Sequence, residues 1–237
     1  MFIVEKKPMS MAAESYRTLR TNIEYSAFNE SLKTIVVTSS EPGEGKTTTA
    51  GNLALSLAQN EKKVLLMDCD LRRGSIHKRF VISNGMGVSE VIVGKASIDS
   101  VIRNISKNLD VITTGNLPLN PSEMLESKNM KSLIKQLRPI YDYIIFDTPP
   151  VLAVTDAQIL STKVDGTILV VKAKKTKKDN VINAKKLLDK VKANVIGTVF
   201  NGVEESKNNY FHYHENENKK HKKSKKKKVM SLGKALG

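Results

Sequence analysis

The sequence predicts an α/β domain in which helices cover both faces of a mostly parallel sheet. Short apolar runs that are typical of buried strands alternate along the chain with segments of helical apolar spacing. Strands that alternate with helices assemble into parallel sheets, because each helix returns the chain to the end of the sheet where the next strand begins. The length of 237 residues fits one domain of this class, and a hydrophobic fraction of 40% is enough to build its core.

Six segments have the short, apolar composition that is expected of strands buried on both faces. Residues 64–67, Val-Leu-Leu-Met, are the clearest example, and the segment at 31–37 ends in the β-branched run Ile-Val-Val. In chain order the predicted strands are residues 31–37, 64–67, 109–112, 143–146, 167–171 and 195–200.

Helical spacing of apolar residues separates these strands. The pattern i, i+3, i+4, i+7, i+8 runs through residues 50–58, which follow a glycine-rich turn. Similar faces occur at residues 130–137, which Pro139 ends, and at residues 181–191. Residues 11–25 are expected to form a further helix ahead of the first strand. These helices supply the cover that a parallel sheet needs.

Positive charge is concentrated near the C-terminus. The chain has 39 Lys and Arg against 24 Asp and Glu, and residues 204–237 hold ten Lys against four Glu, a net charge of +6. Because such a segment cannot bury much apolar surface, we expect a flexible C-terminal tail after a core of residues 1–203. A second basic cluster at residues 172–178 is expected to be a loop. Both stretches read either as solvated surface or as contacts for a polyanion, and neither has the interleaved aromatic residues that stack on bases.

Composition excludes several other classes. Cys69 is the one cysteine of the sequence, so neither an intrachain disulfide nor a zinc ribbon can form. Residues 1–7 lack the apolar segment of a signal peptide, and no run approaches the ~20 apolar residues of a membrane span. A cytoplasmic protein is therefore expected.

The most specific motif is Ser-Ser-Glu-Pro-Gly-Glu-Gly-Lys-Thr-Thr at residues 39–48, between the first predicted strand and the helix at 50–58. A phosphate-binding P-loop requires this strand–loop–helix context. Its glycines let backbone N–H groups wrap around a phosphate, and the helix N-terminus adds the positive end of its dipole. Ser40 stands where the usual pattern has its first glycine. The motif predicts a P-loop NTPase fold.

Individual residues of this motif have distinct expected roles. Lys46 would reach the outer phosphates of a nucleotide, and the hydroxyl of Thr47 would bind Mg²⁺. The expected nucleotide-binding residues of the loop are Gly43, Glu44, Gly45, Lys46, Thr47 and Thr48.

Carboxylates follow two of the predicted strands. Asp68 and Asp70 come directly after residues 64–67, and Asp147 follows residues 143–146. Ligands gather at the carboxyl ends of parallel strands, so these side chains and the P-loop are expected to converge on one crevice. Carboxylates are suitable ligands for Mg²⁺, directly or through water. Carboxylates beside a metal favour phosphoryl transfer over passive nucleotide binding.

The segment Leu-Leu-Met-Asp-Cys-Asp-Leu-Arg-Arg at residues 65–73 resembles the Walker A′ motif of the bacterial tyrosine kinases (BY-kinases), in the CpsD/CapB branch from capsule and exopolysaccharide operons. Residues 14–20, Glu-Ser-Tyr-Arg-Thr-Leu-Arg, match that family's ExxRxxR element. Residues 143–147 resemble its Walker B strand, and residues 120–125 resemble a segment that recurs in it. The resemblance covers about residues 8–203, nearly the whole predicted core.

The resemblance implies an ATP-dependent protein-tyrosine kinase that uses Mg²⁺ on a P-loop scaffold. Asp68, together with Asp70, would contact the metal and accept the tyrosine proton, and Asp147 would hold a water of the metal. Asn201, after the last strand, would contact the adenine base. The implied catalytic residues are Lys46, Asp68, Asp70 and Asp147, and the implied metal site comprises Thr47, Asp68 and Asp147.

The family also implies a ring of eight subunits. In it, the helix at 11–25 would dock on the neighbouring subunit through Glu14, Arg17 and Arg20. The spacing of three places these side chains on one helix face. Without the resemblance, that spacing would favour an exposed ladder of ion pairs within one helix, worth only ~0.2–0.5 kcal/mol per pair.

The tail would then enter the active site of the next subunit. Tyr210 and Tyr213 are the tyrosines beyond the predicted core, and we predict them as sites of autophosphorylation in trans. Tails of the family usually carry a denser tyrosine cluster, so the number of sites is left open.

Partners follow from the same resemblance. It implies a separate membrane-anchored activator, namely the cytoplasmic segment of a polysaccharide co-polymerase that controls chain length. It further implies protein-tyrosine substrates, a phosphatase, and a role in regulating polysaccharide biosynthesis and export. The chain would be cytoplasmic and held at the inner face of the plasma membrane by this partner. Nucleic acid is not expected as a partner.

Three other classes fit less well. A partitioning or positioning ATPase of the ParA/MinD type usually has a lysine early in the phosphate loop, where this chain has Ser40 and Glu41, and an amphipathic terminal helix is not evident at residues 229–237. An iron–sulfur carrier ATPase would need a C-terminal cysteine pair. A polybasic adaptor for lipid or nucleic acid would not need the phosphate loop or the three carboxylates.

Overall fold

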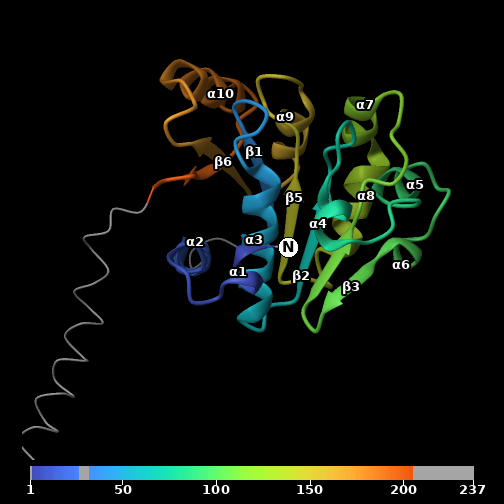
Figure 1. Ribbon diagram of the computed structural model, residues 1–237. Helices are drawn as coiled ribbons and strands as arrows, with labels where there is room; N and C mark the ends of the chain where they lie inside the picture. The colour runs from blue at the N-terminus through green and yellow to red at the C-terminus, as the bar shows by residue number, and fades with distance from the viewer. Residues whose placement is uncertain (1, 27–31, 205–237) are drawn as a thin grey trace, which may run out of the picture. The chain divides into compact units, whose positions relative to one another are not determined.

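The computed structural model describes residues 2–26 and 32–204. In these ranges the chain forms one seven-stranded sheet with the strand order β3-β4-β2-β5-β1-β6-β7 (Figure 1). Every neighbouring pair is parallel except β3 and β4, which are antiparallel. The predicted mostly parallel sheet is confirmed. The strands are β1 (Thr34–Ser39), β2 (Val64–Asp68), β3 (Arg103–Ser106), β4 (Leu109–Ile112), β5 (Tyr143–Asp147), β6 (Gly166–Lys172) and β7 (Val195–Asn201).

The helices expected from apolar spacing are present, and shorter ones join them. Short helices of four to six residues were not predicted, because they hold too few turns to display a periodic face. The helices are α1 (Ile3–Lys6), α2 (Met11–Ser26), α3 (Lys46–Gln59), α4 (Ile76–Phe80), α5 (Val88–Ile92), α6 (Ile98–Val101), α7 (Pro121–Glu126), α8 (Lys128–Leu137), α9 (Asp156–Ser161) and α10 (Lys178–Lys190).

Among the described strands, β3 is the one that the sequence pattern did not predict. It lies at the edge of the sheet and has a single neighbour, β4. Its residues alternate between partly buried and exposed, so it lacks the continuous apolar run of a strand covered on both faces.

Burial on both faces explains the continuous apolar runs of the inner strands. In β1, Ile35 and Val37 belong to the core cluster that includes α3, whereas Val36 belongs to the cluster on the opposite face, which includes α8. In β5, Ile145 and Phe146 divide in the same way. Successive side chains of a strand point to opposite faces, so two covered faces require apolar residues at every position.

The first residues of the chain pack on α3. A Cβ at Gly51 would lie 2.2 Å from the ring of Phe2, so the ring rests directly on the helix backbone. The amide of Val4 donates a hydrogen bond to Oδ1 of Asn52 at 3.1 Å. Figure 1 shows α1 and α2 beside α3, with the sheet behind it. Because α3 begins at Lys46, these contacts tie the N-terminal helices to the element that carries the phosphate loop.

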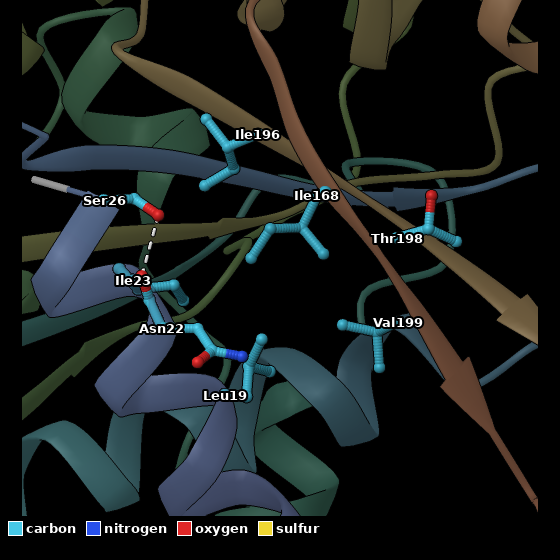
Figure 2. Close-up of a pocket in the computed structure, with 9 residues that line it drawn as sticks. Leu19, Asn22, Ile23, Ser26, Ile168, Ile196, Thr198 and Val199 are labelled. Carbon is cyan, nitrogen blue, oxygen red and sulfur yellow. Dashed lines mark hydrogen bonds between the residues drawn. The ribbon is translucent and has the colours of Figure 1, made fainter.

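A shallow groove of about 140 Å³ lies between α2 and strands β6 and β7. Leu19 and Ile23 of α2 line one side of it, and Ile196 and Val199 of β7 line the other (Figure 2). The residues of β7 are partly buried or exposed, so α2 covers this part of the sheet incompletely. In the part of the chain that the structure describes, no helix has both the length and the apolar character needed to cross a membrane.

The predicted tail lies outside the described residues apart from Glu204. Its flexibility, the boundary at residues 203–204, and the roles of Tyr210 and Tyr213 stay predictions. The loop expected at residues 172–178 is confirmed, because β6 ends at Lys172 and α10 begins at Lys178.

Candidate active site

The glycine-rich loop joins the central strand β1 to α3, as the motif predicted. Gly43 and Gly45 have φ angles of +79° and +100°, in the left-handed region that favours glycine. The helix begins at Lys46, directly after the second of these glycines, and the Lys46 side chain is buried. Within the described ranges, no hydrogen bond or ion pair occupies its ammonium group. The loop thus combines backbone N–H groups, a helix N-terminus and a buried cation, which suits a bound phosphate.

The Glu44 side chain is turned into the protein and braces this loop. Its Oε2 accepts a hydrogen bond from the amide of Glu41 at 3.1 Å, and its Oε1 accepts one from the hydroxyl of Thr176 in the β6–α10 loop. Both carboxylate oxygens of Glu44 are therefore hydrogen-bonded within the protein. The contact with a nucleotide that is expected of Glu44 would be made by its backbone amide.

Asn201, at the end of β7, lies against the same loop. Its Nδ2 donates a hydrogen bond to the Glu44 carbonyl at 3.0 Å. A Cβ at Gly45 would lie 1.8 Å from this Nδ2, so only glycine fits there without moving Asn201. The structure places Asn201 beside the phosphate loop, and its contact with an adenine base stays a prediction.

Replacing Glu44 by alanine should weaken binding of Mg-ADP about tenfold. The substitution removes a buried acceptor that joins the loop to Thr176, and a hydrogen bond to a charged group contributes about 1.5–3 kcal/mol. Isothermal titration of the full chain with Mg-ADP measures the effect. Glu126→Ala, which removes an exposed carboxylate from α7, is the matched control. An unchanged affinity in the Glu44 variant would contradict the bracing role.

Asp68 and Asp147 lie side by side at the carboxyl ends of β2 and β5. They are register partners on adjacent parallel strands, and both are essentially inaccessible to solvent, with 0% and 1% exposure. Oδ2 of Asp68 accepts hydrogen bonds from the amides of Ser75 and Ile76, both at 2.9 Å. In the described residues, neither carboxylate oxygen of Asp147 has a hydrogen-bond partner. The convergence predicted from the strand ends is confirmed for this pair.

Burial dominates the electrostatics of the two carboxylates. It raises the pKa of Asp68 to about 7, although the amide of Ile76 lowers it. Burial and the neighbouring Asp68 raise the pKa of Asp147 well above its usual range, although the nearby hydroxyl of Thr47 and the charge of Lys46 lower it. Two adjacent buried carboxyl groups, one of them with two unsatisfied oxygens, are costly unless a cation compensates them.

The donor set at this point fits Mg²⁺. The hydroxyl of Thr47, which lies 3.3 Å from the hydroxyl of Ser75, adds a neutral oxygen to those of Asp68 and Asp147. Over the described ranges, no group of three or more His, Cys, Asp or Glu side chains is arranged to hold a metal by itself. Mg²⁺ commonly takes one or two carboxylates and completes its shell with water and nucleotide phosphates, so these few protein oxygens suffice.

Asp70 occupies the turn after β2. Its Oδ1 accepts a hydrogen bond from the amide of Arg73 at 3.0 Å, and its own amide donates to Oδ1 of Asp68 at 3.3 Å. Asp70 therefore shapes the turn that places Asp68, and its implied catalytic role is a separate, untested prediction.

An ion pair between an exposed arginine and a buried aspartate, which sequence reasoning missed, holds this turn against α7 and α9. Arg72 donates from Nε to Oδ2 of Asp156 at 2.9 Å and from Nη2 to Oδ1 at 3.0 Å. Ser122, at the start of α7, donates to the same Oδ1 at 2.7 Å. Asp156 is fully buried. The partners lie far apart in sequence, so no local spacing could reveal the pairing, although the resemblance had singled out the segments that contain Arg72 and Ser122.

The expected interface residues of α2 make different contacts within the subunit. Glu14 and Arg17 form an ion pair with 2.7 Å between Oε2 and Nη1. Arg20 instead donates from Nη1 to the carbonyl of Ser56 on α3 at 3.1 Å. An ion pair within the helix is thus present for Glu14 and Arg17, while Arg20 packs on α3 and pairs with Glu24, with 3.8 Å between Nε and Oε2.

A phosphate loop after the central strand, followed by buried carboxylates at the ends of adjacent strands, defines a P-loop nucleotide-binding domain. The comparisons agree, since the family model described as "AAA domain" matches residues 32–198. The chain is 44% identical over 210 residues to the tyrosine-protein kinase YwqD of Bacillus subtilis, covering 88% of this chain and 89% of that protein. It is 36% identical to the putative tyrosine-protein kinase CapB of Staphylococcus aureus, with 88% and 92% covered.

Solved structures also match this chain over most of its length. The kinase domain of the Escherichia coli tyrosine kinase ETK matches with a TM-score of 0.84 at 35% identity, covering 88% of this chain and 82% of that one. The chimerical protein CapA2B2 matches with a TM-score of 0.82 at 35% identity, covering 86% and 90%. MinD of Pyrococcus horikoshii, at 22% identity, a TM-score of 0.63, and coverage of 74% and 72%, shares the fold alone. The chain belongs to the bacterial tyrosine-protein kinases, and the resemblance seen in its motifs is confirmed.

Proposed function

We propose that this chain transfers the γ-phosphoryl group of ATP to tyrosine hydroxyl groups. The observation that carries the proposal is the pair of buried carboxylates, Asp68 and Asp147, in register beside the phosphate loop. A passive nucleotide-binding module gains nothing from two adjacent buried carboxyl groups, because their burial and the unsatisfied oxygens of Asp147 destabilise the fold. A site that binds a cation and moves a proton needs such groups.

Different residues of the chain bind the phosphates, bind the metal ion and accept the proton. The loop amides and Lys46 hold the phosphates, while Thr47, Asp68 and Asp147 would hold Mg²⁺, which when bound neutralises phosphate charge. The tyrosine oxygen forms a bond to the γ-phosphorus, the bond from that phosphorus to the bridging oxygen of ADP breaks, and the phenolic proton passes to Asp68. Free tyrosine has a pKa near 10, and a raised carboxyl pKa, about 7 for Asp68, reduces the mismatch between donor and acceptor.

The phosphate acceptors in this proposal include the chain's own tail. Tyr210 and Tyr213 would be phosphorylated in trans, within a ring of subunits that the α2 residues Glu14, Arg17 and Arg20 help to assemble. Support comes from the tyrosine-protein kinase relatives and from the exposed position of the Glu14–Arg17 pair, whose side chains are 50% and 29% exposed.

Replacing Arg17 by alanine should reduce the size of the assembly and lower the unfolding temperature by no more than about 4 °C. Within the subunit the variant loses an exposed pair with Glu14, worth only ~0.2–0.5 kcal/mol, and a surface hydrogen bond from Nη2 to the carbonyl of Pro8. Arg20→Ala should reduce the size of the assembly and lower the unfolding temperature further, since it loses a partly buried hydrogen bond to the carbonyl of Ser56. Light scattering after size-exclusion chromatography and thermal unfolding measure the two properties, with Lys131→Ala on α8 as a surface control. An Arg17 variant that assembles like wild type would refute its role in the interface.

Regulation in this proposal comes from a separate membrane protein. A cytoplasmic segment of a polysaccharide co-polymerase would activate the kinase and hold it at the inner face of the plasma membrane, and a phosphatase would reverse the reaction. One relative, a putative tyrosine-protein kinase in the cps region of Klebsiella pneumoniae, supports the link to capsule genes, and the neighbour CapA2B2, a chimerical protein, supports a second component. The kinase would thereby regulate polysaccharide biosynthesis and export.

The proposal is tested by incubating the full chain with Mg-ATP and the cytoplasmic segment of the co-polymerase. Phosphotyrosine is then detected with an antibody, in parallel with the Tyr210→Phe/Tyr213→Phe variant. We expect a strong signal from the native chain and loss of most of it from the variant. An undiminished signal would move the acceptor sites away from the tail, and no signal at all would refute the kinase function.

A further inference from the structure

A second cavity, of about 380 Å³, lies beside the candidate active site. It is formed by the turn after β2, helix α4 and the loop after β4. Arg73, His77 and Lys78 contribute three basic side chains to its wall, and no carboxylate lines it. Leu117, which is 62% exposed, adds an apolar surface. The cavity is therefore suited to an acidic ligand rather than to a cation.

This cavity shares a wall with the site of phosphoryl transfer. Ser75 lines the cavity, yet its amide donates to Oδ2 of Asp68 and its hydroxyl lies 3.3 Å from that of Thr47. Next to it, a Cβ at Gly74 would lie 3.0 Å from Oδ2 of Asp68. A group bound in the cavity would thus be separated from the carboxylate pair by a single layer of backbone.

The cavity is preformed and its charges are available. Oδ1 of Asn84 accepts hydrogen bonds from the hydroxyl of Thr114 and the amide of Gly115, both at 3.1 Å, which fixes the rear wall. The side chains of Arg73 and Lys78 are exposed and form no hydrogen bond or ion pair with any residue that the structure describes. Two uncommitted cations on a fixed wall attract carboxylates without first breaking existing pairs.

The chain itself carries a matching acidic sequence. Tyr213, one of the proposed acceptors, is followed by Glu215 and Glu217. Two to four residues of extended chain span roughly 7–14 Å, so these carboxylates stay within that distance of the tyrosine. The negative charge of these two residues, opposite the basic wall of the cavity, favours an acceptor segment as its occupant.

We propose that this cavity is an acceptor-recognition site, in which Arg73 and Lys78 bind the carboxylates that follow the reacting tyrosine. The kinase therefore prefers tyrosines with acidic residues two to four positions downstream, Tyr213 of a second copy among them. This inference rests on the proposed kinase function and adds the substrate class to it.

The test uses two copies of the full chain with different tags. The acceptor copy carries Lys46→Met and has either the native tail or Glu215→Gln/Glu217→Gln. The kinase copy is native, Arg73→Ala/Lys78→Ala, or the control Lys131→Ala on α8. Initial rates of tyrosine phosphorylation on the acceptor are measured by mass spectrometry at low acceptor concentration, together with the KM for ATP.

We expect the cavity variant to phosphorylate the native tail about tenfold more slowly, and the native kinase to lose a similar factor on the neutral tail. Because both changes remove the same contact, the combination should cost little more than either alone. The KM for ATP should not change, and high salt should reduce the difference. The control should behave like the native kinase.

Three results would overturn the inference. The neutral tail could be phosphorylated as fast as the native one, the cavity variant could slow both acceptors equally, or the KM for ATP could rise, which would assign the cavity to the nucleotide. In each case tyrosine would still be phosphorylated, so the proposed function would stand. Absence of phosphotyrosine from every acceptor would overturn the proposed function together with the inference.

Discussion

Replacing Lys46 by methionine should lower the rate of tyrosine phosphorylation at least ~100-fold and leave the protein folded. Lys46 is buried at the first position of α3, and its ammonium group has no protein partner in the described ranges, so its charge is available to the phosphates. Removing one donor that stabilises charge in the transition state commonly reduces kcat by a factor of about 10²–10³. Methionine retains most of the apolar length of the side chain, so the unfolding temperature should change little.

The measurement is the initial rate of phosphotyrosine formation, with thermal unfolding as the check on folding. Lys131→Met on the exposed side of α8 is the matched control, because it makes the same chemical change away from the loop. A Lys46 variant that keeps more than about a third of the native rate would remove the phosphate loop from the mechanism.

Asp147→Asn should have opposite effects on activity and stability. Activity should fall at least ~100-fold, because the carboxylate is one of the few oxygen ligands that the site can offer to Mg²⁺. Stability without nucleotide should rise by about 1–3 kcal/mol, or roughly 3–10 °C in unfolding temperature, since a buried acidic group without partners is replaced by a neutral one. A loss of activity together with a gain in stability is typical of substitutions at functional groups that destabilise the fold.

The pH dependence of this gain has a defined sign. The folded-state pKa of Asp147 is raised, so the folded protein binds the proton more tightly than the unfolded chain does. Its contribution to stability is therefore lost as the pH rises above the unfolded value of about 4. The advantage of Asp147→Asn should be larger at about pH 8 than at about pH 5. Added Mg²⁺ should stabilise the native chain more than the variant, and an asparagine variant that unfolds at a lower temperature would contradict this account.

The carboxylate pair was predictable because it depends on strand order alone. Asp68 and Asp147 each follow an apolar run, and the carboxyl ends of parallel strands lie at one edge of a sheet. The direction of the Glu44 side chain was not predictable, because it depends on Thr176 in a loop that is distant in sequence.

Other contacts could not be predicted from the sequence pattern either, because they too depend on residues that are distant in sequence. Asp156 looks like an ordinary residue at a helix start until the fold brings Arg72 against it. Arg20 shares a spacing with Glu14 and Arg17, but its position on α2 directs it to Ser56 of α3. Sequence periodicity identifies the face of a helix, whereas the partner of that face is decided by tertiary packing.

We expect this chain to transfer the γ-phosphate of ATP to tyrosine rather than to water. The most direct measurement follows that phosphate with γ-labelled ATP, Mg²⁺, the full chain and the co-polymerase segment, with DNA or anionic vesicles added in parallel samples. We expect label on protein tyrosine, principally Tyr210 and Tyr213, and no stimulation by DNA or vesicles. Label released only as inorganic phosphate, at a rate that DNA or vesicles increase, would contradict this expectation and indicate a partitioning ATPase instead.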